Sequence, residues 1–355
     1  MFHDHPAQLD ESPWPHRLAV VLACATFPLI WVGGLVTTYK AGMAVEDWPT
    51  TRGYNMFLYP WETWVYGPFN LFIEHGHRLL GALVGMLTIA FVVAVFLSDR
   101  RPWMKVVSIV ALLGVIGQGS LGGMRVLMDD RQLAMLHGCI GPVFFAFTVA
   151  LAVFTSRLWR QAVPQVSATA ARLQRLAIMT AVLAYVQLVI GATLRHLPLD
   201  VSAKFFEIAV LFHLIVAGAV TGHVFALAVR IVRQHRDEVS LIRPAFGLCS
   251  LIVAQLLLGS ATWIVKYGWP AWFADLRFAA GYTIQANSRL QGLTVTAHVA
   301  TGSLILVTAV LIAVRSLRLF SPFGVELAAK KPGQSGGQRG DLVHRSLPFA
   351  TEPLA

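Results

Sequence analysis

The sequence predicts an all-α integral membrane protein whose eight transmembrane helices form two pseudo-symmetric four-helix bundles. Hydrophobic residues make up 56% of the 355 residues, and charged residues only 13%. The apolar residues occur in blocks of about twenty, long enough to cross a hydrocarbon core of roughly 30 Å. In addition, the second half of the chain repeats the spacing of distinctive polar residues in the first half.

Hydropathy places the eight spans at residues 18–39, 72–97, 106–124, 133–154, 176–194, 205–231, 245–265 and 290–314. The lysines and arginines fall into two sets of loops, one on the side of the two tails and one on the opposite side. The opposite set contains Lys40, Arg52, Arg78 at the mouth of the second span, Arg125, Arg131, Arg195, Lys204, Lys266, Arg277 and Arg289.

The expected organisation is an N-terminal tail (1–17), an N-terminal bundle (18–160), a linker (161–171), a C-terminal bundle (172–320) and a C-terminal tail (321–355). The C-terminal tail is rich in glycine, proline and charge, so we expect it to be disordered and cytoplasmic.

Orientation follows from the basic residues, because positively charged loops stay in the cytoplasm. Most of the 28 lysines and arginines fall in the two tails and in the loops after the second, fourth and sixth spans. Both termini are therefore predicted to be cytoplasmic. The net charge of +10 is explained by this topology, and no soluble basic face suggests a nucleic-acid partner. The N-terminal segment lacks the features of a transit or signal peptide, which favours a bacterial inner membrane.

Four histidines lie at one depth in the predicted bundles. His77, His137, His213 and His298 occupy the even-numbered spans, each within about two to three turns of the outer end. Each is followed four residues later, on the same helix face, by a small residue: Gly81, Gly141, Ala217 or Gly302. The small residues leave room for a flat group beside the histidines.

Paired neutral imidazoles across a bundle are the axial ligands of a low-spin haem iron. The four histidines are therefore candidate haem ligands. Two alternatives stay open: histidines in a proton path of a transporter, and zinc, although zinc prefers about four converging ligands.

The two halves repeat with a shift of 136 residues between His77 and His213, and of 137 between "QGSLGG" and "QLLLGS". With four spans per half, both halves start on the same side, so the repeats are parallel. They differ at one informative place. Glu74 precedes His77 by three residues, whereas Val210 precedes His213. One pocket thus has an acid that can exchange a proton during a reaction.

Other roles for these polar residues remain open. Glu74 could instead pair with Arg78, its i+4 neighbour, or with lipid headgroups. Arg78, Arg125 and Lys266 are candidate partners for haem carboxylates, and equally ordinary interfacial anchors. The aromatic-rich first outer loop, residues 40–70, is a candidate lid on the membrane surface. His75 points away from His77 around the helix and is given no role.

These residues resemble the haem A synthase family. The resemblance rests on "GGLVTTYKAGMAVEDWP", "EHGHRLLG", "AMLHGCIGP", "LFHLIVAG" and "TAHVATG", and it extends over nearly all eight spans. Some family members carry a cysteine pair in the first outer loop. This chain has no cysteine between Lys40 and Phe72, so that redox chemistry is not expected here.

The resemblance implies an enzyme that oxidises the C8 methyl of haem O to a formyl group by successive hydroxylations, with oxygen or water as the oxygen source. It implies that His213 and His298 ligate a resident haem b, that His77 and His137 line the haem O site, and that Glu74 is catalytic. Expected partners are haem O synthase, a membrane electron donor and cytochrome c oxidase assembly, and a homo-oligomer is compatible with this interpretation. The alternative function is a bis-histidine dihaem electron-transfer cytochrome, for which an acid in only one pocket has no purpose.

Overall fold

The computed structural model describes residues 12–198, 200–273 and 275–322. Most of the predicted N-terminal tail and nearly all of the predicted disordered C-terminal tail lie outside these residues. Within the described part, eight helices are long and apolar enough to cross a membrane. The prediction of an all-α protein with eight transmembrane helices is confirmed, and the chain is a multi-pass membrane protein.

The eight long helices are α1 (Trp14–Thr38), α3 (Phe69–Ser98), α4 (Pro102–Leu127), α5 (Arg131–Thr155), α7 (Ala170–Arg195), α8 (Ala203–Gln234), α9 (Val239–Tyr267) and α10 (Arg289–Leu319). Most extend a few residues beyond the predicted spans, because helical hydrogen bonding continues into the polar interface. Short helices lie between them: η1 (Ala41–Met43), α2 (Trp61–Val65), α6 (Arg157–Gln161) and η2 (Ala271–Phe273).

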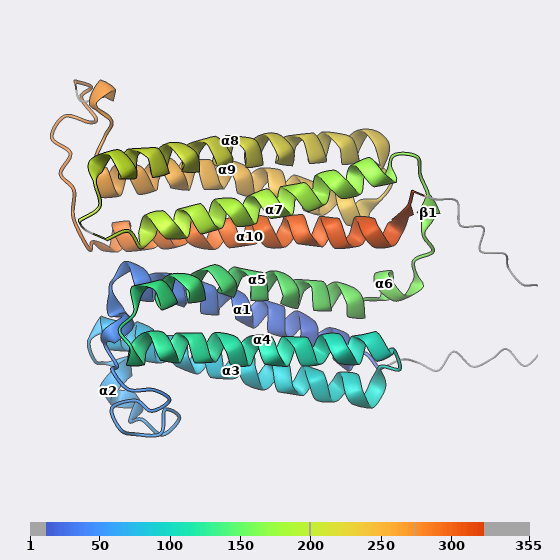
Figure 1. Ribbon diagram of the computed structural model, residues 1–355, viewed down its shortest axis with the longest axis horizontal. Helices are drawn as coiled ribbons and strands as arrows, with labels where there is room; N and C mark the ends of the chain where they lie inside the picture. The colour runs from blue at the N-terminus through green and yellow to red at the C-terminus, as the bar shows by residue number, and fades with distance from the viewer. Residues whose placement is uncertain (1–11, 199, 274, 323–355) are drawn as a thin grey trace, which may run out of the picture. The chain divides into compact units, whose positions relative to one another are not determined.

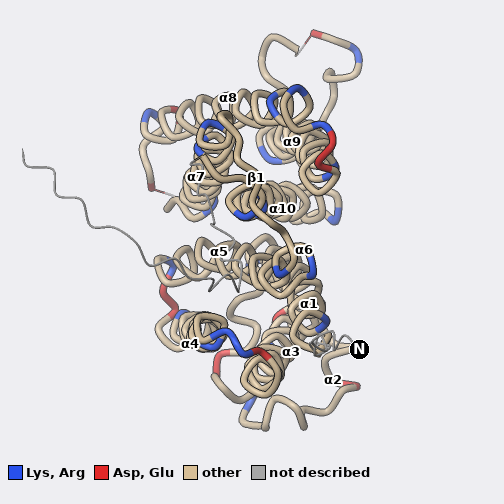
Figure 2. Tube along the Cα trace, turned by 90° about the vertical axis from the view of Figure 1, so that its right-hand side faces the viewer, with Lys and Arg blue, Asp and Glu red and all other residues tan. Residues whose placement is uncertain are grey.

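The long helices form two groups of four (Figures 1 and 2). One group contains α1, α3, α4 and α5, and the other α7, α8, α9 and α10, with α10 packed against both α1 and α5. The proposed pseudo-symmetry and the exact domain boundaries stay predictions. We call the end of both groups that carries the 40–70 loop the outer end, and the opposite end the inner end.

Several helix starts are fixed by local hydrogen bonds. The side chain of Asp130 accepts from the backbone N–H groups of Gln132 and Leu133 and so begins α5. Ser202 and Ser288 cap α8 and α10 in the same way. A cap satisfies N–H groups that have no partner within the helix. At the outer end these starts place α5, α8 and α10, the helices that carry three of the four histidines.

Each helix group has its own apolar core. Leu22, Phe91 and Met104 are fully buried in the first group, and Leu227 and Ile312 in the second. Many other apolar side chains face outward, as expected where hydrocarbon rather than water surrounds a helix.

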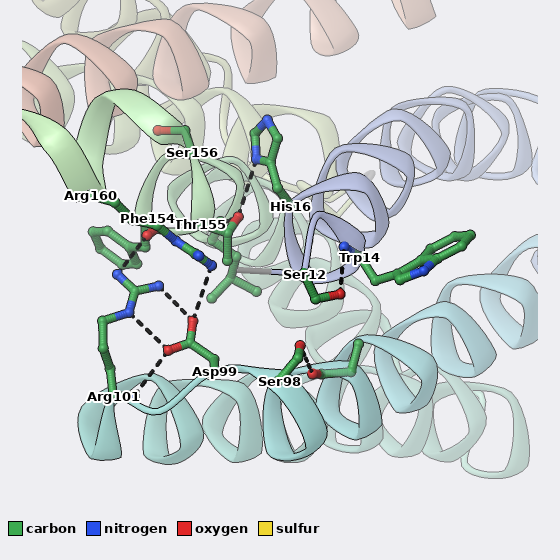
Figure 3. A network of polar contacts seen from close by, with 12 residues as sticks. Ser12, Trp14, His16, Ser98, Asp99, Arg101, Phe154, Thr155, Ser156 and Arg160 are labelled. Atoms are coloured by element: carbon green, nitrogen blue, oxygen red, sulfur yellow. Dashed lines mark hydrogen bonds and ion pairs between the residues drawn. The ribbon is translucent and has the colours of Figure 1, made fainter. Parts of the chain in front are cut away.

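At the inner end, Asp99 is the centre of a polar network (Figure 3). It accepts hydrogen bonds from Arg101 Nε and Nη2 at 2.9 and 2.7 Å, and Arg160 Nη2 lies 3.4 Å away. Arg101 also donates to the carbonyl of Phe154 at 3.0 Å. Burial alone would raise the pKa of Asp99, but the hydrogen bonds from Arg101 outweigh it and lower that pKa. The network fastens the α3–α4 loop to the end of α5 and to α6.

A short parallel strand pair lies at the same end. β1 (Gln165–Val166) pairs with β2 (Phe320–Ser321), with Gln165 opposite Phe320 and Val166 opposite Ser321. The pair ties the segment between the helix groups to the end of α10 (Figure 1).

We expect Asp99→Asn to destabilise the fold by about 1–3 kcal/mol, the cost of breaking charge-assisted hydrogen bonds at a buried acceptor. The pKa of Asp99 is lowered in the folded state, so its contribution is fully present above the unfolded pKa of about 4 and is lost as the pH falls through the lower folded value. Thermal unfolding in detergent at pH 7 and at lower pH measures this.

Asp237→Asn is the matched control, because Asp237 pairs with Arg236 only at 3.9 Å and its side chain is fully exposed. Equal melting temperatures for the Asp99 and Asp237 variants would contradict a stabilising role for the Asp99 network at the inner end.

Candidate functional site

A large cavity opens at the outer end and is lined by all eight long helices and by part of the 40–70 loop. Its volume is about 1860 Å³. Pockets for one small ligand usually measure roughly 300–1,000 Å³. The cavity is therefore large enough for more than one bulky group.

The four predicted histidines all line this cavity and form two pairs. The ring centres of His77 and His137 are 6.3 Å apart, and those of His213 and His298 are 6.4 Å apart. Two imidazoles on opposite sides of one metal ion, with N–metal bonds of about 2 Å, place their ring centres roughly 6 Å apart. Both pairs therefore have the separation that a bis-histidine haem needs.

Each of these rings is seated against a glycine on the preceding long helix. A Cβ atom at Gly33, Gly122, Gly191 or Gly259 would lie 2.9, 3.2, 3.2 or 3.1 Å from Cε1 of His77, His137, His213 or His298, respectively. A bulky side chain at any of these four positions would collide with the imidazole. Gly122 and Gly259 are part of the sequence repeat, but their contacts with the histidines were not predicted. Each contact joins two different helices, and the sequence of one helix does not show which residue of another helix lies against it.

The small residues one turn below the histidines also face the cavity. Gly81, Gly141, Ala217 and Gly302 line it. A Cβ atom at Gly81 or Gly141 would meet nothing within 4 Å, so space remains open beside both. A flat macrocycle would fill this space.

Three glutamines point to a missing partner in the cavity. Gln118, Gln187 and Gln255 line it, and in the described part of the chain each has a buried amide atom without a hydrogen-bond partner. The Gln187 amide nitrogen lies 3.2 Å from both ring nitrogens of His213. Unpartnered buried polar atoms are costly, and a bound group commonly satisfies them.

The donor set fits haem better than zinc. Across the described residues, no three His, Cys, Asp or Glu side chains converge in a way that could hold a metal ion. Paired imidazoles, small residues beside them and open space between the helices fit a planar metal chelate, which brings its own four nitrogen ligands.

The acid predicted beside the first pair is present and deeply buried. Glu74 is 1% exposed and lines the cavity. Arg125 Nη2 lies 3.2 Å from both of its carboxylate oxygens, and Arg78 Nε lies 3.3 Å from Oε1. Pairing with Arg78, the alternative considered from sequence, is thus present, but it comes together with a contact from Arg125 that sequence reasoning did not anticipate. Val210, at the matching place in the other bundle, also lines the cavity.

Comparison with known proteins agrees with this geometry. A family model named COX15-CtaA and described as cytochrome oxidase assembly protein matches residues 16–207, more than half of the chain. The chain belongs to this family. The heme A synthase of Shouchella clausii (strain KSM-K16) is 26% identical over 259 residues, 70% of this chain and 76% of that protein. The heme A synthase of Symbiobacterium thermophilum (strain DSM 24528) is 30% identical over 178 residues, 48% of this chain and 55% of that protein.

In this COX15-CtaA family member, Arg78 fastens the outer loop as well as the acid. Its guanidinium donates to the backbone carbonyls of Val45, Asp47 and Thr50 at 2.8, 2.6 and 2.9 Å. The N–H groups of Arg78 thus donate to these carbonyls and to Glu74. These contacts do not support the predicted contact between Arg78 and a haem carboxylate. Arg125 and Lys266 line the cavity, and their haem contacts stay predictions.

The outer loop forms part of the cavity wall. Met43, Trp48 and Met56 line the cavity, and the lid role of the loop stays a prediction. His75, which had no role from sequence, anchors this loop: it is 1% exposed, its Nδ1 lies 3.2 Å from the Thr51 hydroxyl, and its ring centre lies 4.9 Å from that of Trp64. Its position on the opposite side of the helix from His77 explains why the two histidines have different surroundings.

Asp47 holds a tight turn in the same loop. Its carboxylate accepts from the N–H groups of Arg52 and Gly53 at 2.7 and 2.8 Å and from the Thr50 hydroxyl. Arg52 and Gly53 both have positive φ angles, 52° and 81°, which the hydrogen bonds to Asp47 stabilise. Burial opposes ionisation of Asp47, but these hydrogen bonds outweigh it and lower its pKa to about 2.

Gly259→Leu should displace His298 and remove most of the haem from the second pair, because a side chain there would collide with the imidazole. The haem-to-protein ratio of the purified protein measures this. Gly247→Leu in the same helix is the control, since a Cβ at Gly247 meets nothing within 4 Å and the residue does not line the cavity. Undiminished haem in the Gly259 variant would mean that the contact does not position His298.

Asp47→Asn should speed hydrogen exchange of the Arg52 and Gly53 amides at pH 7 by about ten- to a hundred-fold, because hydrogen bonds to a charged acceptor are each worth about 1.5–3 kcal/mol. Since the folded pKa of Asp47 is lowered to about 2, the wild-type turn should stay protected until the pH approaches that value. Glu46→Gln, at an exposed neighbouring position, is the control. Loss of wild-type protection already near pH 4 would contradict this account.

Proposed function

We propose that this protein is a haem A synthase, which oxidises the C8 methyl of haem O to a formyl group. One observation carries the proposal: a buried carboxylate held by two arginines stands beside one histidine pair and has no counterpart beside the other. The relatives named heme A synthase support the same conclusion.

The two histidine pairs would then have different tasks. His77 and His137, beside Glu74, would hold the substrate haem O. His213 and His298 would hold a resident haem b, which supplies single electrons by cycling between ferric and ferrous iron. The pair separations of 6.3 and 6.4 Å support a haem at each pair, and the presence of Glu74 beside only one of them supports the division.

Glu74 would transfer protons during oxidation of the substrate. Two successive hydroxylations of the methyl carbon give a gem-diol, which loses water to leave the formyl group. With dioxygen as the oxygen source, each hydroxylation consumes two electrons and two protons and releases the second oxygen atom as water. With water as the source, each hydroxylation instead releases two electrons and two protons. Glu74 Oε1 or Oε2 can accept a proton during these steps and return it. Arg78 and Arg125 would be positioning residues, because they hold the carboxylate of Glu74.

A dihaem electron-transfer cytochrome is the alternative. It would need the two histidine pairs but no acid, and two pockets serving only as a relay should be alike. Burying a carboxylate and two guanidinium groups in a membrane protein is costly, so their presence at one pair favours chemistry there.

We further propose a bacterial inner-membrane location with both termini in the cytoplasm, from the distribution of lysine and arginine. Haem O synthase would supply the substrate, and a membrane electron donor would reduce haem b. The product, haem A, would be inserted into cytochrome c oxidase during its assembly.

Co-expression with a haem O synthase in a host that lacks haem A tests the function directly. Extracted haems, separated by chromatography, should include haem A or its hydroxylated intermediate. Recovery of haems B and O alone, with well-folded protein present, would rule out the synthase.

Glu74→Gln should keep its bound haem but slow formation of the oxidised product by about a hundred- to ten-thousand-fold, the usual range for loss of a general acid or base. His213→Ala should instead lose haem b. Haem content and product analysis of both variants, with exposed Glu62→Gln as a control, distinguish the two effects. Equal haem loss in the Glu74 and His213 variants would contradict the division of labour between the pockets.

A further inference from the structure

Two cations at the outer end of the second bundle have no acidic partner. Arg195 ends α7 and Lys266 lies in the last turn of α9, so both are at the same end of the bundle (Figure 1). Both line the cavity that contains His213 and His298. Among the described residues, no carboxylate lies within ion-pair distance of either side chain.

The first bundle is different. There, Arg78 and Arg125 share the carboxylate of Glu74 at 3.3 and 3.2 Å. At the place that matches Glu74, the second bundle has Val210, which cannot neutralise a cation. Within the described part of the chain, Arg195 and Lys266 therefore carry positive charge that no ion pair neutralises.

Arg195 is held so that its charge stays in the cavity. Its Nη2 donates to the carbonyl of Gly34 at 2.7 Å and to the hydroxyl of Thr38, both on α1 of the other bundle. These neutral partners position the guanidinium without cancelling its charge. Lys266 lines the same cavity from the end of α9. Two like charges beside an apolar cavity are unfavourable unless an anion lies between them.

We propose that Arg195 and Lys266 form an anion-binding subsite that takes the carboxylates of the haem held by His213 and His298. The proposal rests on the proposed function for the presence of that haem. Its chemistry matches, because haem b carries two carboxylates on one edge and the subsite offers two cations. A guanidinium can donate two parallel hydrogen bonds to a carboxylate, and an ammonium adds a point charge.

An anionic lipid headgroup could offer similar charge, but the observations favour the haem. The two cations line the same cavity as the histidine pair, and Arg195 is tied inward to α1 rather than directed along the outer surface of the bundle. The sequence alone suggested Lys266 for this role. From sequence, Arg195 was counted only among the basic residues on the side opposite the tails.

The test measures how fast haem b leaves the purified holoprotein for an excess of apomyoglobin, in nanodiscs made only of neutral lipid. Arg195→Gln and Lys266→Gln should each speed haem transfer by about ten- to a hundred-fold, the range expected for loss of a charge-assisted hydrogen bond. Arg195→Gln should also lower the reduction potential of haem b, because a nearby cation destabilises the ferric form. Lys204→Gln is the control: it removes an exposed charge at the outer end of the same bundle, outside the cavity lining.

A second variant separates charge from structure. Thr38→Val removes the hydroxyl that Arg195 contacts and keeps the cation, so it should leave haem transfer and reduction potential close to wild type. If Thr38→Val and Arg195→Gln change the haem transfer rate and the reduction potential equally, Arg195 serves only to join the two bundles. The proposed anion-binding subsite would then be wrong.

Three other outcomes would overturn the proposal. If Arg195→Gln and Lys266→Gln both transfer haem at the wild-type rate, neither residue contacts the haem carboxylates. Loss of co-purified anionic lipid from Arg195→Gln, seen by native mass spectrometry with haem retention unchanged, would assign the cations to a headgroup. A wild-type protein that binds no haem would overturn the proposed function and the subsite together, whereas the other two results overturn the subsite alone.

Discussion

The close approach of four imidazole rings to four glycines on neighbouring helices determines the geometry of the site. A glycine allows a ring to lie directly on the helix backbone, so each contact sets both the distance between two helices and the direction of one imidazole. These contacts lie within the pairs α1–α3, α4–α5, α7–α8 and α9–α10. Because the rings are held back against the helices, their ring-centre separations of 6.3 and 6.4 Å leave space between them. The cavity follows from that spacing.

The polar groups around this frame explain how one architecture can hold two different sites. In the first bundle, a carboxylate and two guanidinium groups neutralise each other and are tied to the outer loop. In the second, no described carboxylate forms an ion pair with Arg195 or Lys266. The same helix arrangement therefore surrounds its two histidine pairs with different charges: an acid held by two cations beside one, and cations without an ion pair at the other.

Much of the fold was accessible from sequence, because a membrane span is a long-range compositional signal that does not depend on tertiary contacts. The four histidines and the unrepeated Glu74 were also accessible, since each is unusual within an apolar helix. The seating glycines, the contact from Arg125 and the loop-anchoring role of His75 were not. Each depends on residues from different helices meeting in space: Arg125, for example, is 51 residues from Glu74, and its partner could not be inferred from helical spacing.

The contacts of Arg78 couple the outer loop to the buried acid. One guanidinium holds three carbonyls of the outer loop and the carboxylate of Glu74. The loop segment from Val45 to Thr50 cannot lift away without breaking those bonds or drawing the cation off the acid. Any change that displaces this loop segment therefore also changes the charge environment of Glu74, although the two are separate in the chain.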